Sequence, residues 1–326
     1  MEIQTENSKV KAVFFGAGNF AVKILEGILT FDFLEIVGIV TQPDKPAGRD
    51  KRLAPCHVKE WLNNNPQEGI KIFAPEKLRL EAEQILSETS PDLVIVADYG
   101  QMIPESIINY PRYKCLNVHG SLLPDLRGAV PATMAILRGY TKTGVSIPIM
   151  TKGLDDGDII ASQELSILPT DNTLSLRMRL AEIAIPLLKE VLPKWFKGEI
   201  SPTPQDHSKA TITWEKDIEK DKAKITKDTL ALDAEKMIRA FSPWPIAWCE
   251  AVINGKTKRI KIFKASMAET PFLNNAENKV GSFFKYNKRL YLSLIDGALL
   301  IENVQLEGKT VFDAKNALFL NGKTIQ

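Results

Sequence analysis

The sequence predicts an α/β protein in which a Rossmann-like open, mostly parallel sheet is followed by a small β-barrel. Three observations predict this architecture. Short apolar runs alternate with helical patterns through the first part of the chain, which is the order of elements in a parallel sheet. Residues 92–97 (DLVIVA) are almost wholly apolar, as expected of a central strand covered on both faces. Beyond residue 209, several short strands are separated by turn signals, which favours a barrel.

The elements of the first part can be placed in order. Strands are predicted from apolar runs at residues 9–15, 34–40, 71–73, 92–97, 115–119, 143–150 and 159–167. Helices are predicted, from apolar residues at helical spacing, at residues 20–29, 57–63, 78–87, 131–139 and 173–195. A segment rich in Pro, Gly and basic residues, from about 43 to 55, indicates a polar loop.

The composition of the sequence changes after residue 196. Residues 197–209 contain Gly, Ser and two Pro, which is typical of a linker. A helix is then predicted at 234–241, and short strands at 251–253, 259–264, 281–285, 290–293 and 298–304. We therefore expect a catalytic domain at 1–196, a linker at 197–209 and an OB-like barrel domain at 210–326.

Composition narrows the class of protein. Hydrophobic residues make up 44% and charged residues 25% of 326 residues, ordinary values for a globular protein large enough for two domains. No run approaches the roughly 20 apolar residues that span a bilayer, and MEIQTENSK lacks the apolar core of a signal peptide. We expect a cytoplasmic protein without membrane segments. Three widely spaced cysteines predict neither a disulfide framework nor a zinc site, and we expect no metal.

The charge is unevenly distributed. Residues 209–326 carry 20 Lys and Arg against 14 Asp and Glu, whereas residues 1–208 carry 22 against 26. A basic C-terminal part fits a polyanionic partner such as RNA. A solvated, lysine-rich surface is the alternative interpretation.

A glycine-rich turn follows the first strand. Residues 16–21 (GAGNFA) fit the G-x-G-x-x-A pattern between a strand and a helix, where a dinucleotide pyrophosphate can bind. That fingerprint also requires an acidic residue closing the second strand, but this strand ends in Thr41-Gln42-Pro43. Because any tight strand-to-helix turn favours Gly, the pattern favours a structural turn over a nicotinamide site.

Two polar residues stand out on a predicted strand. Asn117 and His119 are two positions apart, so both side chains point to the same face, at the strand end where α/β sheets bind ligands. A structural histidine is the alternative. Residues 153–158 (GLDDGD) follow the strand that ends at Met150. If both strands are parallel, an acid from this turn meets Asn117 and His119; an acidic surface turn is the alternative.

An amide, an imidazole and a carboxylate suit acyl transfer to an amine. The amine attack creates a tetrahedral oxyanion, which Asn117 and a protonated His119 can stabilise. A nearby carboxylate favours the charged imidazole and can accept the proton of the amine, directly or through water. Such chemistry needs no nucleophilic Ser or Cys.

Several segments resemble the folate-dependent formyltransferase family. They are VFFGAGNFAVKILEGIL, TQPDKPAGRDKRLAP, PDLVIVADYGQMIP, NVHGSLLPDLRGAVPATMAILRG and TGVSIPIMTKGLDDGDI. The pairing of N-x-H-x-S-L-L-P with a later L-D-x-G is the most specific of these features. Within the family, the segment RAFSPWPIAW resembles the entry to the C-terminal barrel of members that act on methionyl-tRNA.

The resemblance implies a donor, an acceptor and a set of site residues. The donor would be 10-formyltetrahydrofolate, and the acceptor the amino group of initiator methionyl-tRNA; we expect a monomer. The catalytic residues would be Asn117, His119 and Asp155. Folate would contact Ser121, Leu122, Leu123 and Pro124, and the tRNA acceptor end would meet Lys45, Arg49, Lys51 and Arg52.

One departure from the pattern leaves a second acceptor open. Members acting on tRNA usually read His-Pro-Ser where this chain has His119-Gly120-Ser121, and the glycine form resembles members that formylate amino-sugar nucleotides. The basic 45–52 segment and the basic C-terminal part favour tRNA. A non-catalytic RNA-binding protein would have broken catalytic positions, but all three are intact; a nicotinamide oxidoreductase rests on the glycine-rich turn alone.

Overall fold

The computed structural model describes residues 9–47, 50–269 and 279–325. Contacts divide the chain into two compact units. The first comprises residues up to Gly128, Lys142–Ser166 and Arg177–Ile212; the second comprises Ala129–Thr141, Ile167–Leu176 and residues from Thr213 onward. The division into domains at 1–196 and 210–326 stays a prediction.

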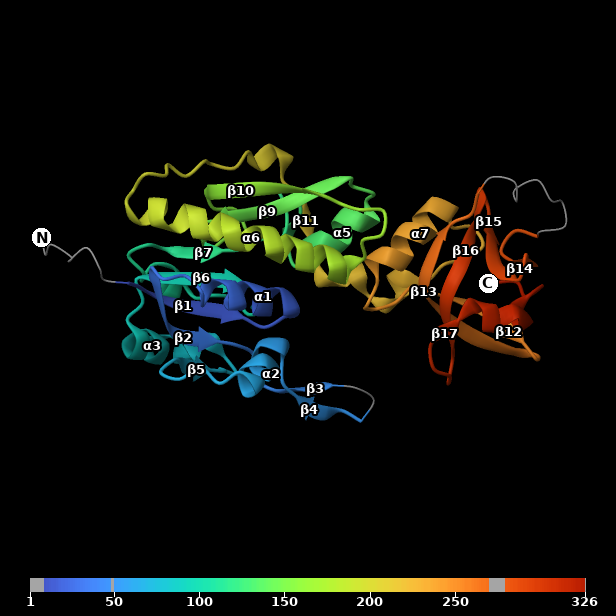
Figure 1. The fold of residues 1–326 in the computed structure, drawn as a ribbon, viewed down its shortest axis with the longest axis horizontal. Helices are drawn as coiled ribbons and strands as arrows, with labels where there is room; N and C mark the ends of the chain where they lie inside the picture. The colour runs from blue at the N-terminus through green and yellow to red at the C-terminus, as the bar shows by residue number, and fades with distance from the viewer. Residues whose placement is uncertain (1–8, 48–49, 270–278, 326) are drawn as a thin grey trace, which may run out of the picture. The chain divides into compact units, whose positions relative to one another are not determined.

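The first unit is built on a five-stranded parallel sheet (Figure 1). Its strand order is β5-β2-β1-β6-β7. The strands are β1 (Val10–Gly16), β2 (Leu34–Val40), β5 (Lys71–Phe73), β6 (Leu93–Ala97) and β7 (Cys115–Asn117). In the centre, Phe14 of β1 pairs with Ile39 of β2 and Ile95 of β6, each in parallel register. The predicted Rossmann-like parallel sheet is therefore confirmed.

Helices cover both faces of this sheet. They are α1 (Asn19–Ile28), α2 (His57–Asn64), α3 (Leu78–Thr89), α4 (Glu105–Ile108) and, from Arg177 onward, α6 (Thr173–Phe196). Apolar residues of α3 and α4 form one buried cluster with Val13 and Val94. Helix α1 also contacts β1 and β6, and on it Gly27 lies against Ile185 of α6. This double cover explains why every residue of β6 is buried.

The strand predicted at 143–150 runs in the opposite direction to the one we expected. Strand β9 (Lys142–Pro148) is antiparallel to β10 (Ile159–Ser166). It also meets the β7 segment in antiparallel fashion, through bridges between Leu116 and Ile149 and between His119 and Ser146. The expectation that both strands end at one edge of a parallel sheet was wrong. An apolar run shows that a strand is buried but carries no information on its direction.

Two further pairs of short strands, β3–β4 and β8–β11, lie outside the five-stranded sheet. The segment predicted as a loop contains a hairpin of β3 (Lys45–Ala47) and β4 (Arg52–Ala54), which pair in antiparallel register and extend from the sheet (Figure 1). Strand β8 (Arg127–Gly128) pairs with β11 (Ile212–Thr213). A short helix, η1 (His207–Lys209), is the one regular element within the predicted linker of residues 197–209.

The second unit contains an antiparallel half-barrel, in the order β12-β13-β16-β15-β14 with β17 on β16. Its strands are β12 (Trp248–Ile253), β13 (Lys256–Met267), β14 (Phe283–Tyr286), β15 (Arg289–Leu294), β16 (Gly297–Leu306) and β17 (Phe312–Asp313). The helices of the second unit are α5 (Pro131–Leu137), α7 (Ala231–Ala240), η2 (Glu215–Ile218), η3 (Lys220–Ala223) and η5 (Ala314–Leu320).

The half-barrel encloses its own core. Helix α7 packs on β13 and β16, and its Ile238 is buried together with Ile262 and Phe283 of the sheet. Near the end of the chain, Thr324 bridges to Ser282 and Ile325 to Ala251. These bridges reach both edges of the sheet, so the predicted small C-terminal barrel is confirmed as an antiparallel half-barrel.

Candidate active site

The structure brings together the three residues predicted to be catalytic. Asn117 is the last residue of β7, and His119 follows it two positions later. The amide Nδ2 of Asn117 donates a 2.9 Å hydrogen bond to Oδ1 of Asp155. Oδ2 of the same carboxylate lies 3.6 Å from Nδ1 of His119. The His119 side chain is 5% exposed and that of Asp155 13%, so water has little access to the contact between them.

Asp155 reaches the site by a sharp turn in the chain after β9. Its backbone has φ of 48°, a left-handed conformation that is unfavourable for a residue other than Gly. Its Oδ2 accepts a 2.9 Å hydrogen bond from the backbone amide of Gly128. The carboxylate is therefore held by two donors, one on each oxygen, while it faces the imidazole.

The contacts of His119 define its tautomer. Nε2 lies 2.9 Å from the carbonyl oxygen of Leu126, and because a carbonyl can only accept, Nε2 carries the proton. The other nitrogen, Nδ1, faces the carboxylate of Asp155.

Asp156, the neighbouring acid, points elsewhere. Oδ1 of Asp156 accepts a hydrogen bond from the hydroxyl of Thr151, within the same loop. Of the two adjacent acids, Asp155 is the one that meets both Asn117 and His119.

The segment Ser121–Pro124, predicted to contact folate, follows directly on His119. Ser121 and Leu123 are buried, whereas Leu122 and Pro124 are half-buried. Its shape is held by Ser146 of β9, a fully buried residue. The hydroxyl of Ser146 donates to the carbonyl of Ser121 at 2.8 Å and accepts from the amide of Leu123 at 3.0 Å.

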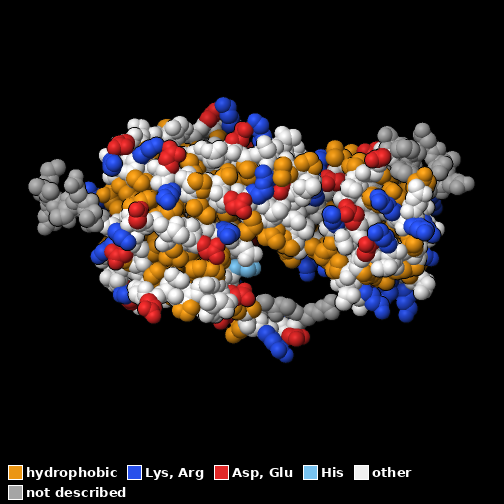
Figure 2. All heavy atoms as spheres, viewed as in Figure 1, with side chains coloured by type: hydrophobic (Ala, Val, Ile, Leu, Met, Phe, Trp, Pro, Cys, Tyr) orange, Lys and Arg blue, Asp and Glu red, His pale blue; other side chains and the backbone are white. Residues whose placement is uncertain are grey.

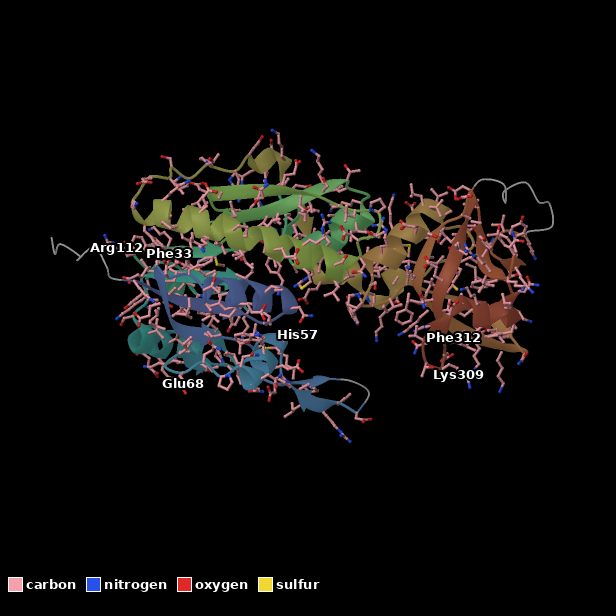
Figure 3. The ribbon with its side chains drawn as sticks, in the orientation of Figure 1. Phe33, His57, Glu68, Arg112, Lys309 and Phe312 are labelled. Atoms are coloured by element: carbon pink, nitrogen blue, oxygen red, sulfur yellow. The ribbon has the colours of Figure 1, made fainter. Side chains whose placement is uncertain are left out.

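Of the basic residues predicted to meet tRNA, Lys45 lies on β3, Arg52 on β4 and Lys51 directly before β4. Lys45, Lys51 and Arg52 are exposed, and Arg49 lies outside the described residues. Figure 3 shows the side chain of His57 at the start of α2, the helix that follows the hairpin. The hairpin extends away from the sheet that carries the catalytic residues (Figure 1), so the structure forms two separate groups of predicted site residues.

The glycine-rich turn has a structural explanation. A Cβ added to Gly18 would lie 1.9 Å from Oδ2 of Asp98. This carboxylate forms a 2.5 Å ion pair with Nη2 of Arg177. The space beside the turn is therefore filled by an acid of the chain itself, which would repel a pyrophosphate. Gly18 admits the side chain of Asp98, as the interpretation of a structural turn requires.

Cys115 lies next to the site but has the properties of a packing residue. It is fully buried, and burial raises the pKa of its thiol, so it remains neutral. Its Sγ lies 3.4 Å from Sδ of Met150. All three cysteines of the chain are free.

Several groups that bind the catalytic residues, or the segments carrying them, through hydrogen bonds could not be found from the sequence. These are the carbonyl of Leu126, the amide of Gly128, the hydroxyl of Ser146 and the side chains of Arg127 and Gln205. The first two are backbone groups, which leave no signal in residue identity. Gln205 lies in a segment whose composition is typical of a linker.

The described residues contain no group of three or more His, Cys, Asp or Glu side chains placed to hold a metal ion. Within these same ranges, no helix is long and apolar enough to cross a membrane.

Comparisons with known proteins agree with the fold. Residues 9–192 match the family model described as formyl transferase, and residues 217–324 match the model described as formyl transferase, C-terminal domain. The methionyl-tRNA formyltransferase of Sulfurihydrogenibium sp. (strain YO3AOP1) is 38% identical over 314 residues, which cover 95% of this chain and 96% of the relative. The chain therefore belongs to the formyl transferase family, within its methionyl-tRNA formyltransferase group.

Solved structures share the fold at lower identity. HypX from Aquifex aeolicus, in complex with tetrahydrofolic acid, is 17% identical with a TM-score of 0.66; the match covers 97% of this chain and 48% of HypX. An N-formyltransferase from Helicobacter canadensis, in complex with folinic acid and dTDP-3-aminofucose, is 19% identical with a TM-score of 0.61. That match covers 90% of this chain and 98% of the other.

Proposed function

We propose that this protein transfers the formyl group of 10-formyltetrahydrofolate to the amino group of initiator methionyl-tRNA. The observation that carries the proposal is the carboxylate of Asp155, placed between the amide of Asn117 and the imidazole of His119. Relatives that match this chain over nearly their whole length, named methionyl-tRNA formyltransferases, support the choice of acceptor. We also propose that the protein is a monomer and that it acts in the cytoplasm.

In the proposed reaction the amine is the nucleophile. Its nitrogen attacks the formyl carbon, the C–N bond to the folate breaks, and the folate nitrogen takes up a proton. One N–H of the Asn117 amide is donated to Asp155, so its second N–H remains to donate to the oxyanion. The positive charge of a protonated His119 stabilises the same oxyanion at short range.

Asp155 has two tasks in this scheme. Its negative charge lies beside Nδ1 of His119, where it can form an ion pair with an imidazolium. Its oxygens, each of which accepts one hydrogen bond, retain a lone pair that can take the proton of the attacking amine, directly or through water. We assign the donor to the segment Ser121–Pro124 because it leaves the sheet directly after His119.

The proposed tRNA contacts are basic and exposed. On the hairpin they are Lys45, Lys51 and Arg52, with Arg49 assigned from the sequence alone. On the half-barrel, Figure 2 shows Lys and Arg side chains gathered along one edge. Strand β13 supplies Lys256, Arg259 and Lys264 as exposed residues. Basic side chains of this kind can bind RNA phosphates.

On the half-barrel, two basic side chains lie against the ring of Trp248, which is buried, and of the two Arg259 is exposed. The guanidinium of Arg259 lies 3.8 Å from the ring centroid of Trp248, and Nζ of Lys224 lies 5.3 Å from it. These contacts hold the cations in place. Lys309 and Phe312 also lie on this unit (Figure 3). We propose that the half-barrel contributes phosphate contacts to tRNA binding.

A second acceptor is favoured by one observation. Gly120, between His119 and Ser121, fits the pattern of enzymes that formylate amino-sugar nucleotides. This alternative predicts that the basic residues of the hairpin and of the half-barrel are dispensable for use of the acceptor.

One assay separates the two acceptors. The protein is incubated with 10-formyltetrahydrofolate and either charged initiator tRNA or a 4-amino-sugar nucleotide, and formylated product is measured. The proposal predicts transfer to the tRNA. Transfer to the sugar without transfer to the tRNA would reject it, and the same charged tRNA with an acetylated amino group serves as the control for an amine acceptor.

A further inference from the structure

Gln205 belongs to the segment expected to be a plain linker, but its side chain is almost completely buried. It is 6% exposed, whereas its neighbour Asp206 is exposed. A polar side chain is buried in this way only where its hydrogen-bonding groups have partners. The partners of Gln205 are therefore informative about its role.

Every hydrogen-bonding position of the Gln205 amide is used. Nε2 donates to the carbonyl oxygen of Asp155 at 2.9 Å and to that of Gly157 at 2.6 Å. Oε1 accepts from Nε of Arg127 at 3.1 Å and from Nη2 at 2.6 Å. An amide offers two N–H donors and two lone pairs, so no position is left over.

The two carbonyls that Gln205 holds belong to the loop of the proposed general base. Asp155 has the left-handed φ of 48°, which persists only where surrounding contacts impose it. Gly157 is equally constrained, because an added Cβ would lie 1.9 Å from the carbonyl oxygen of Ile149. The bonds from Gln205 fasten the loop on both sides of Asp156, in the conformation that points the Asp155 carboxylate at His119.

Arg127 connects the same network to the opposite side of the site. Its side chain is 7% exposed and, besides Gln205, Nη2 lies 3.1 Å from Nδ1 of His207. The residue after it, Gly128, supplies the backbone amide that binds Oδ2 of Asp155. One short segment thus holds the Asp155 carboxylate directly and its backbone through Gln205.

We propose that Gln205 is a positioning residue for catalysis: it sets the orientation of Asp155 by binding the carbonyls of Asp155 and Gly157, and Arg127 holds it in place. The inference rests on the proposed role of Asp155 in formyl transfer. It gives the segment that follows α6 a task in the reaction step, besides that of joining two parts of the chain.

Two substitutions separate donation to the loop from anchoring by Arg127. Gln205→Glu keeps the size of the side chain and its attraction to Arg127 but removes both N–H donors. Gln205→Met keeps the approximate size and removes every hydrogen bond. We expect kcat to fall about 100-fold in both variants, the effect of a misplaced catalytic group, with little change in KM for the donor or for tRNA.

Trp195→Phe is the matched control. Trp195 is half-buried and donates a 2.9 Å hydrogen bond to the carbonyl of Tyr113, which precedes β7 at the end of the strand remote from Asn117. This variant also loses a side-chain hydrogen bond to a backbone carbonyl, so it reports the cost of a general loss of stability. Its kcat should stay near that of the wild type.

The experiment combines steady-state kinetics with hydrogen exchange of residues 151–158, followed by mass spectrometry without substrate. Faster exchange in this loop and a lower kcat in both Gln205 variants, but not in Trp195→Phe, would support the inference. Wild-type kcat in Gln205→Glu, or a rise in KM alone, would overturn it. If the wild type itself used another amine, the proposed tRNA function would fail, and the same comparison on that amine would still test Gln205.

Discussion

The side-chain amide of Asn117 donates a 2.9 Å hydrogen bond to Oδ1 of Asp155, and this bond joins the end of β7 to a loop 38 residues further along the chain. The same carboxylate binds the amide of Gly128 and faces His119. Two segments, at residues 117–119 and at Gly128, thus converge on an acid from a third. The account predicts that changes to the groups holding this arrangement alter turnover or donor binding in separable ways.

The hydroxyl of Ser146 should matter for the donor. Ser146→Ala removes the bonds to Ser121 and Leu123 and leaves the buried amide of Leu123 without its partner. A buried donor without a partner costs about 1–3 kcal/mol of the free energy of unfolding, so the melting temperature should fall. KM for 10-formyltetrahydrofolate should rise about tenfold, the equivalent of about 1.4 kcal/mol.

Ser162→Ala is the control for that experiment. Ser162 bonds to the hydroxyl of Ser146 at 3.1 Å but leaves both loop bonds in place. Its KM for the donor should remain near the wild-type value. An unchanged KM in Ser146→Ala would show that the shape of the 121–124 segment does not govern donor binding.

The basic hairpin should determine the salt dependence of tRNA use. Replacing Lys51 and Arg52 by Ala should lower kcat/KM for tRNA and leave KM for the donor unchanged. The slope of log kcat/KM against log salt should become less steep by about 0.7–0.9 for each tRNA phosphate that the variant no longer neutralises. Arg49→Ala is expected from the sequence to act in the same direction.

Lys71→Ala changes the charge elsewhere on the surface and serves as the comparison. Lys71 is exposed on β5 and pairs with Glu88 at 3.3 Å. Its salt slope should equal that of the wild type. Identical slopes for the hairpin variant and for Lys71→Ala would contradict phosphate binding by the hairpin.

The glycine-rich turn should depend on Asp98. The backbone φ of Gly18 is −85°, which Ala adopts without strain, so Gly18→Ala tests the clash with the Asp98 carboxylate alone. We expect a loss of about 1–3 kcal/mol in the free energy of unfolding, as in other over-packed sites. Chemical denaturation measures this loss.

A double-mutant cycle completes that test. Asp98 has φ of 54°, which Gly tolerates, so Asp98→Gly removes the carboxylate without backbone strain. In that background Gly18→Ala should cost little. An equal cost in both backgrounds would mean that something other than Asp98 requires the glycine.

Much of the fold could be predicted because its signals are local. The apolar runs at 34–40 and 92–97 and the helical spacing at 78–87 correspond closely to β2, β6 and α3. The direction of β9 could not be predicted in this way, because an antiparallel and a parallel buried strand have the same apolar pattern. The β3–β4 hairpin was missed because its residues are those of a polar loop.

Only part of the candidate site could be predicted from residue spacing. The spacing of Asn117 and His119 placed them together, but spacing left three acids in the turn at 153–158 as candidates. The resemblance singled out Asp155, for a reason visible in its contacts with Asn117 and His119. Gln205 could not be found in this way, because its role depends on two backbone carbonyls about 50 residues earlier in the chain.

Substituting Asp155 and Asp156 one at a time shows which of the two adjacent acids takes part in formyl transfer. Single-turnover transfer of labelled formyl from 10-formyltetrahydrofolate to methionyl-tRNA is measured for the wild type, Asp155→Ala and Asp156→Ala. We expect a loss of about 10²–10⁴-fold in the rate for Asp155→Ala, the usual contribution of a general base, with donor binding kept. Asp156→Ala should turn over near the wild-type rate. Near-normal turnover in Asp155→Ala, with the loss in Asp156→Ala instead, would contradict the account.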